Sequence, residues 1–202
     1  MKKYLIIIIL SYFSLEAIAQ QIGTFGNLII SDMHSSYRSN PNYGGEAIFS
    51  SSFGIDYHFN REKKIDYVLS LTYERKGDNY NQPTLVETFR VNYLTLKGMT
   101  KFGNSDFDVQ VGPYVGFLTF VDKKPDNQSS DLTELWTHKV DLGMSMSLNQ
   151  YLFGFDKMAY YLRGEVNYGL TNVVGSGGIT TDIFLRNFTY GLGLAVRWNY
   201  KY

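Results

Sequence analysis

The last fifteen residues of the chain alternate without a break between apolar and polar or small side chains. Even-numbered positions from 188 to 202 are all apolar, and the odd-numbered positions between them are polar, glycine or alanine. This period of two predicts a β-strand with one apolar face. Strands of about ten residues with lipid-facing apolar positions and aromatic ends are what a membrane-spanning β-barrel requires. We therefore predict a transmembrane strand that ends in Trp198, Tyr200 and Tyr202.

The same period of two occurs in further segments and raises the predicted number of strands to eight. The segments are residues 20–30, 49–59, 65–74, 88–102, 107–117, 140–148, 160–170 and 188–202. In the first segment Ile22, Phe25, Leu28 and Ile29 do not keep one parity, so the facing of that strand stays open. The fourth segment turns Leu94 outward but is ambiguous towards its end.

The predicted connections sort by length. Long connections, at residues 31–44, 76–87, 122–135 and 172–187, alternate with short ones, at residues 60–64, 103–105 and 150–156. Bacterial outer-membrane barrels have short periplasmic turns, longer outer loops and an even number of strands. The sequence therefore predicts an all-β fold, a single eight-stranded antiparallel up-and-down transmembrane barrel. Both termini are expected in the periplasm, with loops such as residues 123–134 facing out.

The N-terminus carries an export signal. Lys2 and Lys3 precede an apolar run at residues 4–13, and Ala17-Ile18-Ala19 matches a signal-peptidase site. The apolar run is too short to span a bilayer as a helix. We predict a cleaved signal peptide at residues 1–19 and one outer-membrane barrel domain at residues 20–202.

The polar face of the predicted strands separates the chain from a lipocalin, which lines its interior with apolar groups. Here that face carries acidic and basic side chains, which are costly against lipid and must therefore point inward and pair. The residues expected to form this structural interior network are Glu74, Asp141, Arg163, Glu165 and Arg197. We favour a structural plug over a proton path or a catalytic acid. Side chains fill the interior of an eight-stranded barrel, so we expect no open pore.

Few residues offer catalytic or metal chemistry. The chain has no Cys, and Lys plus Arg equals Asp plus Glu at 19 each, so neither a thiolate metal site nor a nucleic-acid partner is expected. Its three His residues (34, 58 and 138) show no metal-binding spacing. His58 with Ser50 or Ser52 is the in-strand pairing that a lipid-modifying enzyme could use, but His58 should lie near the periplasmic end. We predict no catalytic, cofactor-binding or metal-binding residues.

Several short runs resemble a known family. They are Leu71-Thr-Tyr-Glu-Arg-Lys-Gly77, Asn92-Tyr-Leu-Thr-Leu96, Val111-Gly-Pro-Tyr-Val-Gly-Phe117, Asp141-Leu-Gly143, Tyr168-Gly-Leu-Thr-Asn172 and Tyr190-Gly-Leu-Gly-Leu194. Together they resemble the outer-membrane β-barrel domain family that includes PorT. The resemblance implies an outer-membrane barrel of a Gram-negative cell, in a family of which one branch assists type IX secretion. Lys97 departs from the family pattern, which usually has Pro there. The family supplies no catalytic residues.

These observations predict a small, closed, non-catalytic outer-membrane barrel whose exposed loops carry any specific binding. The alternatives are a lipid-A-modifying enzyme and an accessory subunit of a type IX secretion or envelope complex. Expected partners are outer-membrane lipids, the barrel assembly machinery, which should read the terminal strand, and an envelope or secretion partner that the sequence does not identify.

Overall fold

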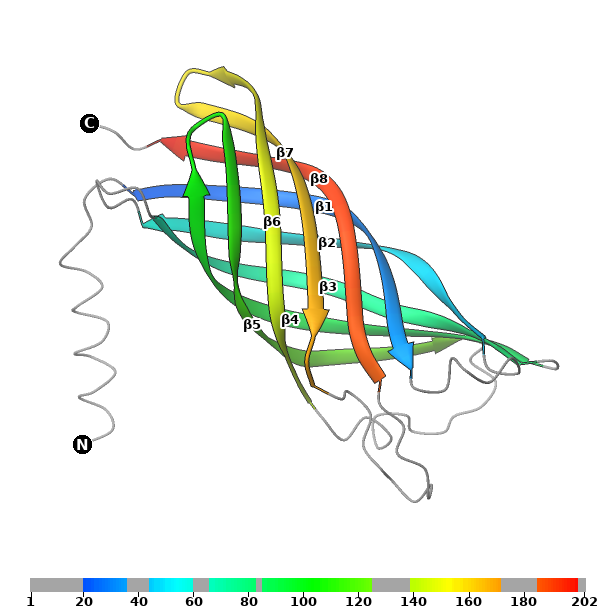
Figure 1. Ribbon diagram of the computed structural model, residues 1–202. Coiled ribbons are helices and arrows are strands. Elements are labelled where there is room, and N and C mark those ends of the chain that lie inside the picture. The colour runs from blue at the N-terminus through cyan, green and yellow to red at the C-terminus, as the bar shows by residue number, and fades with distance from the viewer. Residues whose placement is uncertain are drawn as a thin grey trace, which may run out of the picture.

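The computed structural model describes residues 20–35, 44–59, 66–82, 85–124, 139–171 and 185–199. Its strands are β1 (Gln20–Ser35), β2 (Gly44–Phe59), β3 (Asp66–Gln82), β4 (Leu85–Gly103), β5 (Phe107–Lys124), β6 (Val140–Phe155), β7 (Met158–Gly169) and β8 (Leu185–Asn199). Each strand pairs antiparallel with the next, and β8 pairs with β1 to close a barrel (Figure 1). The predicted fold class is thereby confirmed. The predicted signal peptide, Tyr200, Tyr202 and most of the predicted long loops lie outside the described residues.

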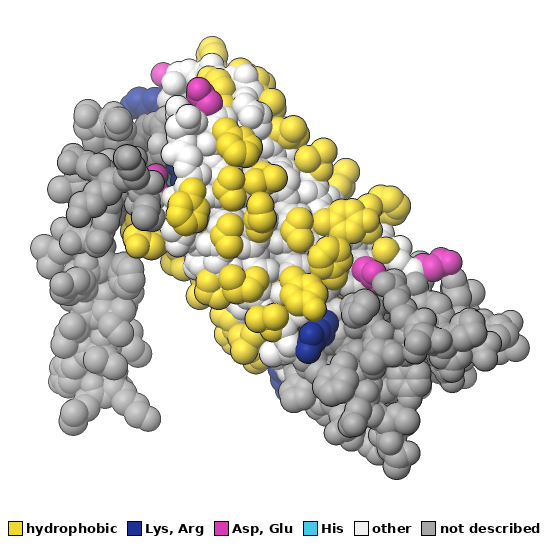
Figure 2. Space-filling view, viewed as in Figure 1, with side chains coloured by type: hydrophobic (Ala, Val, Ile, Leu, Met, Phe, Trp, Pro, Cys, Tyr) yellow, Lys and Arg dark blue, Asp and Glu magenta, His cyan; other side chains and the backbone are white. Residues whose placement is uncertain are grey.

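Side chains alternate between the two faces as predicted on most strands. On β6, for example, exposed and buried residues alternate strictly from Val140 to Asn149. The outward positions carry Leu, Met, Val, Ile, Phe and Tyr, and Figure 2 shows such side chains spread over the visible outer face. The predicted facings of β2, β3, β5, β6, β7 and β8 are confirmed wherever their side chains are described. In the described part of the chain, no helix is long and apolar enough to span a lipid bilayer.

The hydropathy of the residues along β1 does not alternate cleanly, because apolar residues occupy both of its faces. Leu28 is 76% exposed on the outside, whereas Phe25 and Ile29 are 5% and 3% exposed and point into the lumen. Space for the Phe25 ring comes from Gly54 on β2, since a Cβ there would lie 2.6 Å from a ring atom. The mixed parity therefore reflects apolar packing inside the barrel.

The facing of β4 is regular through the stretch that the sequence left ambiguous. Leu94 and Leu96 are 41% and 40% exposed, while Lys97 and Met99 are buried inside. The irregularity lies earlier in the strand, where the register with β5 shifts between Asn92 and Tyr93. The extra residue is Thr119 on β5, and opposite it Val91, Asn92 and Tyr93 are buried in succession, which obscures the period of two on β4.

Two predicted connections are wrong in extent. Residues 76–82 and 85–87, expected in a long loop, continue the β3 and β4 ladder up to the pair Gln82 and Leu85. Residues 150–155, expected in a short connection, extend β6, and only Asp156 and Lys157 form the turn. Hydropathy stops alternating at both places although backbone pairing continues. Strand ends at Ser35, Gly44, Lys124 and Leu185 also take in residues that were expected in the other long connections.

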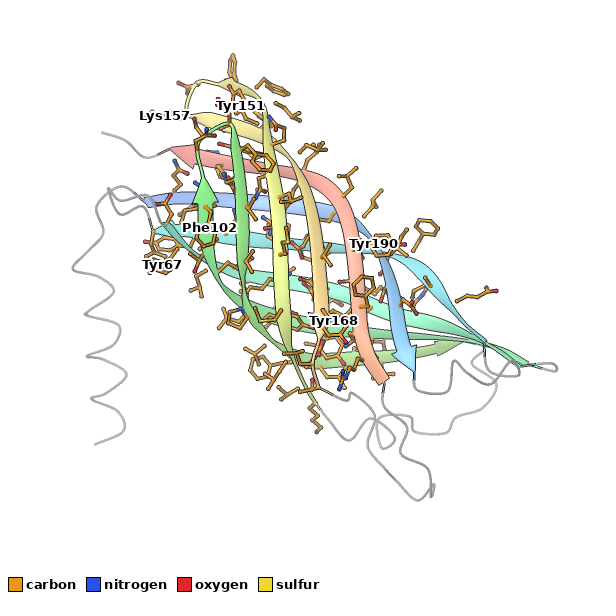
Figure 3. The ribbon with its side chains drawn as sticks, viewed as in Figure 1. Tyr67, Phe102, Tyr151, Lys157, Tyr168 and Tyr190 are labelled. Atoms are coloured by element: carbon orange, nitrogen blue, oxygen red, sulfur yellow. The ribbon has the colours of Figure 1, made fainter. Side chains whose placement is uncertain are left out.

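We call the end of the barrel where β1 begins, β8 ends and the short turns lie the turn end, and the opposite end the loop end. Aromatic side chains lie on the outer surface near both ends (Figure 3). Tyr67 and Phe102 lie toward the turn end and are 50% and 46% exposed, whereas Tyr168 and Tyr190 lie toward the loop end and are 39% and 44% exposed. Aromatic girdles of this kind flank the apolar band of transmembrane barrels.

Candidate functional site

Buried ion pairs connect opposite walls of the barrel lumen. Arg163 on β7 contacts Asp56 on β2 at 2.7 Å and Glu165 at 2.9 Å. Lys97 on β4 contacts the other Glu165 oxygen at 2.6 Å. All four side chains are at most 3% exposed. The two oxygens of Glu165 therefore bridge two cations that belong to different strands.

The same set of contacts continues toward the loop end. Glu74 on β3 contacts Lys97 and, at 3.0 Å, Lys76. Lys76 then contacts Asp141 on β6 at 3.1 Å. The result is a continuous series of contacts in which the charge alternates in sign at every step. We call it the interior ion-pair chain; its members are Asp56, Arg163, Glu165, Lys97, Glu74, Lys76 and Asp141.

Asp141 ends the chain in a dense set of donors. Besides Lys76, its carboxylate accepts hydrogen bonds from Asn187 at 2.8 Å, from the Tyr114 hydroxyl at 3.1 Å and from Thr171 at 3.3 Å. Hydrogen bonds that a buried carboxylate accepts offset part of the free-energy cost of removing it from water. Asp141 is 0% exposed. Its four partners lie on β3, β5 and β8 and directly after the end of β7.

Arg197 forms a separate pair near the turn end. Its guanidinium donates to both oxygens of Asp108 on β5, the second contact being 3.2 Å long. Asn149 and Gln110 donate to the same carboxylate at 2.8 and 2.9 Å. None of these contacts joins the Arg197 pair to the interior ion-pair chain.

Aromatic rings lie against three of the buried cations. The Arg163 guanidinium lies 3.9 Å from the centre of the Phe25 ring, and that of Arg197 lies 4.1 Å from the Tyr161 ring. Lys76 lies 4.8 Å from the Tyr114 ring. Cation–π contacts of this kind are stronger where water is excluded. The lumen therefore combines ion pairs with ring packing.

All five predicted interior residues lie in the lumen, but not in one network. Glu74, Asp141, Arg163 and Glu165 belong to the interior ion-pair chain, whereas Arg197 pairs with Asp108. The side chains of all five are at most 3% exposed. The alternation of apolar and polar positions along each strand correctly predicted that all five side chains face inward.

The sequence-based list of interior residues omitted two lysines. Lys97 shares its inward parity with Tyr93 and Thr95, and alternation with Leu94 and Leu96 could have identified it. Lys76 follows Glu74 by two residues and so has the same facing, but it fell within a predicted loop. Both are 0% exposed and belong to the interior ion-pair chain, Lys97 between Glu165 and Glu74 and Lys76 between Glu74 and Asp141.

The pairing considered for an enzyme is not assembled. His58 is 2% exposed, and neither ring nitrogen has a hydrogen-bond partner among the described residues. Ser52 instead accepts a hydrogen bond from Asn27 at 3.3 Å. Ser52 and His58 are six positions apart on an extended strand, a distance of about 20 Å. Within the described ranges there is also no group of three or more His, Asp or Glu side chains arranged to hold a metal ion.

The apolar outside, the charged inside and the closed eight-stranded barrel define a small bacterial outer-membrane β-barrel protein. The solved structure of Neisserial surface protein A, NspA, matches with a TM-score of 0.50 and 10% sequence identity, covering 89% of this chain and 97% of its own. At this identity the likeness shows a shared fold only.

Two further solved structures match less closely. The outer membrane protein OprG from Pseudomonas aeruginosa has a TM-score of 0.48 and 9% identity, over 89% of this chain and 96% of its own. Ail, the attachment invasion locus protein of Yersinia pestis, has a TM-score of 0.46 and 11% identity, over 90% and 100%. No family model matches the sequence. Nor does any curated protein match it. The resemblance to the family that includes PorT therefore stays a prediction.

Proposed function

We propose that the protein is a closed, non-catalytic outer-membrane barrel whose loop-end connections carry its specific binding. The observation that carries this proposal is the interior ion-pair chain, which links β2, β7, β4, β3 and β6 through side chains that are at most 3% exposed. A conducting path would have to separate these pairs. Leaving one member of a buried pair without its partner costs about 3–5 kcal/mol.

Conductance measurements test the closed lumen. The purified, folded barrel is expected to carry no steady current in planar bilayers, because an eight-stranded barrel with a filled interior holds no water column. Gel mobility of boiled and unboiled samples shows that the protein is folded. Stable single-channel steps of porin size from folded protein would contradict the proposal.

The orientation follows from the loop lengths and belongs to the same proposal. The turn end, with both termini and the connection at residues 104–106, faces the periplasm, and the loop end faces outward. Since the chain has no Cys, single cysteines can report this directly. An impermeant maleimide should label Lys139→Cys at the loop end in intact cells and Ser105→Cys at the turn end only after permeabilisation. The reverse pattern would invert the topology.

The absence of catalysis has its own test. A lipid-A-modifying enzyme is the competing function, and His58 is the general base it would need. Lipid A from cells with and without the protein should have the same mass spectrum. A change in acyl chains that His58→Ala abolishes would establish the enzyme instead.

A second candidate role is that of an accessory subunit in a type IX secretion or envelope complex. The sequence runs that resemble the family including PorT favour it. Crosslinking in intact cells, followed by identification of the captured proteins, tests this role. Secretion-complex subunits captured through the loop end or the turn end would support it, and capture of the assembly machinery alone would not.

The terminal strand is proposed as the segment that the barrel assembly machinery reads. β8 closes the barrel against β1 along 15 paired positions. Without its end, unpaired backbone groups would face lipid, at several kcal/mol each. Deletion of residues 198–202 should therefore leave the chain unfolded in the periplasm. Normal insertion of the truncated chain would contradict this.

A further inference from the structure

The side chain of His58 is buried in the lumen near the turn end without a polar partner. His58 is the next-to-last residue of β2 and is 2% exposed. Neither ring nitrogen has a hydrogen-bond partner among the described residues. A neutral imidazole carries one N–H donor and one acceptor nitrogen, and buried groups of this kind are normally hydrogen-bonded. His58 is therefore a buried titratable group that no hydrogen bond ties to one protonation state.

The strands on either side of β2 offer His58 uncharged neighbours at its own level. His58 pairs with Val68 on β3, and Val68 pairs with Met99 on β4. Val68 and Met99 are each 2% exposed, so the three side chains form one row that faces the lumen. On the other side His58 pairs with Gln21 of β1. Cross-strand neighbours lie about 4.5–5.5 Å apart, so a charge on the ring would be placed directly against apolar groups.

Three cations and one carboxylate act electrostatically on His58, namely Arg197, Lys101, Arg163 and Asp108. Each of the three cations already has an acidic partner. The pairs are Arg197 with Asp108, Arg163 with Asp56 and Glu165, and Lys101 with Asp66. Asp56 lies two residues before His58 with the same facing, and β6 contributes the uncharged Asn149 at this end. The positive charges around His58 thus outnumber the carboxylates that act on it.

We propose that His58 is an acid-sensitive switch of the closed lumen. The neutral ring fits the apolar row beside it. A proton on the ring adds a fourth positive charge to the three that act on this site, and the repulsion separates the pair of Arg197 and Asp108. The turn end of the lumen then loosens, while the interior ion-pair chain toward the loop end keeps its contacts. This inference rests on the closed lumen of the proposed function.

The proposed switch gives the stability of the barrel a pH dependence of defined sign. In the unfolded chain His58 takes up a proton near pH 6.5, whereas the closed lumen holds the neutral ring. The unfolded chain therefore binds more protons below that pH, and the barrel loses stability as the pH falls. One such proton raises the equilibrium constant for unfolding about tenfold between pH 7.5 and pH 5.5.

Urea unfolding in lipid vesicles at pH 7.5, 6.5 and 5.5 tests this switch with the full chain. The native protein is compared with His58→Leu, which suits the apolar row, and with His58→Gln, which keeps a polar side chain. Neither replacement takes up a proton in this pH range. His34, His138 and all carboxylates are present in the three proteins, so the difference in their pH dependence reports His58 alone.

The equilibrium constant for unfolding of the native protein should rise about tenfold more than that of either variant between pH 7.5 and pH 5.5. The same pH dependence in all three proteins would overturn the inference. A native protein that gains stability over the variants at pH 5.5 would also overturn it. In that case the protonated ring is paired, for which the second oxygen of Asp56 is available, since it has no hydrogen-bond partner among the described residues.

Hydrogen exchange of the native protein in vesicles locates the loosening without any substitution. After correction for the intrinsic exchange rates, amides of residues 195–199 at the turn end should exchange up to about tenfold faster at pH 5.5 than at pH 7.5. Amides of residues 141–146 toward the loop end should keep their protection. Unchanged protection at the turn end, or equal loss at both ends, would overturn the switch. Steady current at pH 7.5 would instead refute the closed lumen of the proposed function.

Discussion

Leu162 and Arg163 are neighbours in the chain, yet they lie in opposite environments. Leu162 is 38% exposed on the outer face, and Arg163 is 0% exposed inside with two carboxylates and an aromatic ring around it. Leu96 and Lys97 repeat the contrast on β4. In a water-soluble barrel the apolar member of each pair would be inside. The comparison shows that the outer solvent is lipid and that the interior is stabilised by paired charges.

The largest expected effect comes from removing the inner member of the first pair. Arg163→Ala leaves the Asp56 carboxylate and one carboxylate oxygen of Glu165 buried without the cation that they contact. This should destabilise the barrel by about 3–5 kcal/mol. Leu162→Met, the control on the outer face, conserves volume and should cost less than about 1.5 kcal/mol. Urea unfolding in detergent or lipid vesicles measures both. If the two variants had equal free energies of unfolding, the contrast between a charged, paired interior and an apolar outer face would be contradicted.

The next effect concerns the outer face of β8. Leu194→Arg places a charge against lipid and should cost about 2–4 kcal/mol, enough to lower the folded fraction sharply. Ala195→Ser, one residue further and 3% exposed inside, should be nearly silent. The readout is the gel shift between boiled and unboiled samples. Normal folding of Leu194→Arg together with failure of Ala195→Ser would mean that the facing is inverted.

A smaller effect distinguishes inner from outer glycines. Gly54→Ala would press a Cβ to within 2.6 Å of both the Phe25 ring and the Leu71 carbonyl oxygen, so it should cost about 1–3 kcal/mol. Gly26→Ala faces outward with nothing within 4 Å and should change stability little. Melting temperatures of the folded forms compare the two. A larger loss for Gly26→Ala would contradict the assigned packing.

The finest distinction lies within the interior. Lys97 and Arg163 share Glu165, so their substitutions by Ala should couple by about 0.5–3 kcal/mol in a double-mutant cycle. Among the described residues Arg163 and Arg197 share no ion-pair partner, and their effects should add to within about 0.5 kcal/mol. If conditions for unfolding are matched, the two cycles are directly comparable. Strong coupling in the second cycle would join Arg197 to the interior ion-pair chain.

Parity predicted the fold and the inward facing of the charges, but not their partners. Arg197 and Asp108 are 89 positions apart, and their contact depends on barrel closure and register, which no local pattern encodes. The facing of β1 could not be predicted from its apolar positions, because the lumen holds the apolar ring of Phe25 against a buried guanidinium group. On β6, Leu152 is an extra residue between the pairs Tyr151–Tyr161 and Phe153–Tyr160, and it reverses the facing of the residues after it. The period of two therefore did not predict the end of this strand.

The most direct test of the two faces is a scan of accessibility along β8 in a lipid bilayer. Spin labels on single cysteines at positions 191 to 196 are exposed in turn to oxygen, which concentrates in lipid, and to a water-soluble nickel complex. Oxygen accessibility should peak at Leu192, Leu194 and Val196 and be low at the three positions between them, with low nickel accessibility throughout. High nickel accessibility at the three apolar positions, or no period of two, would contradict a closed barrel with lipid outside and paired charges inside.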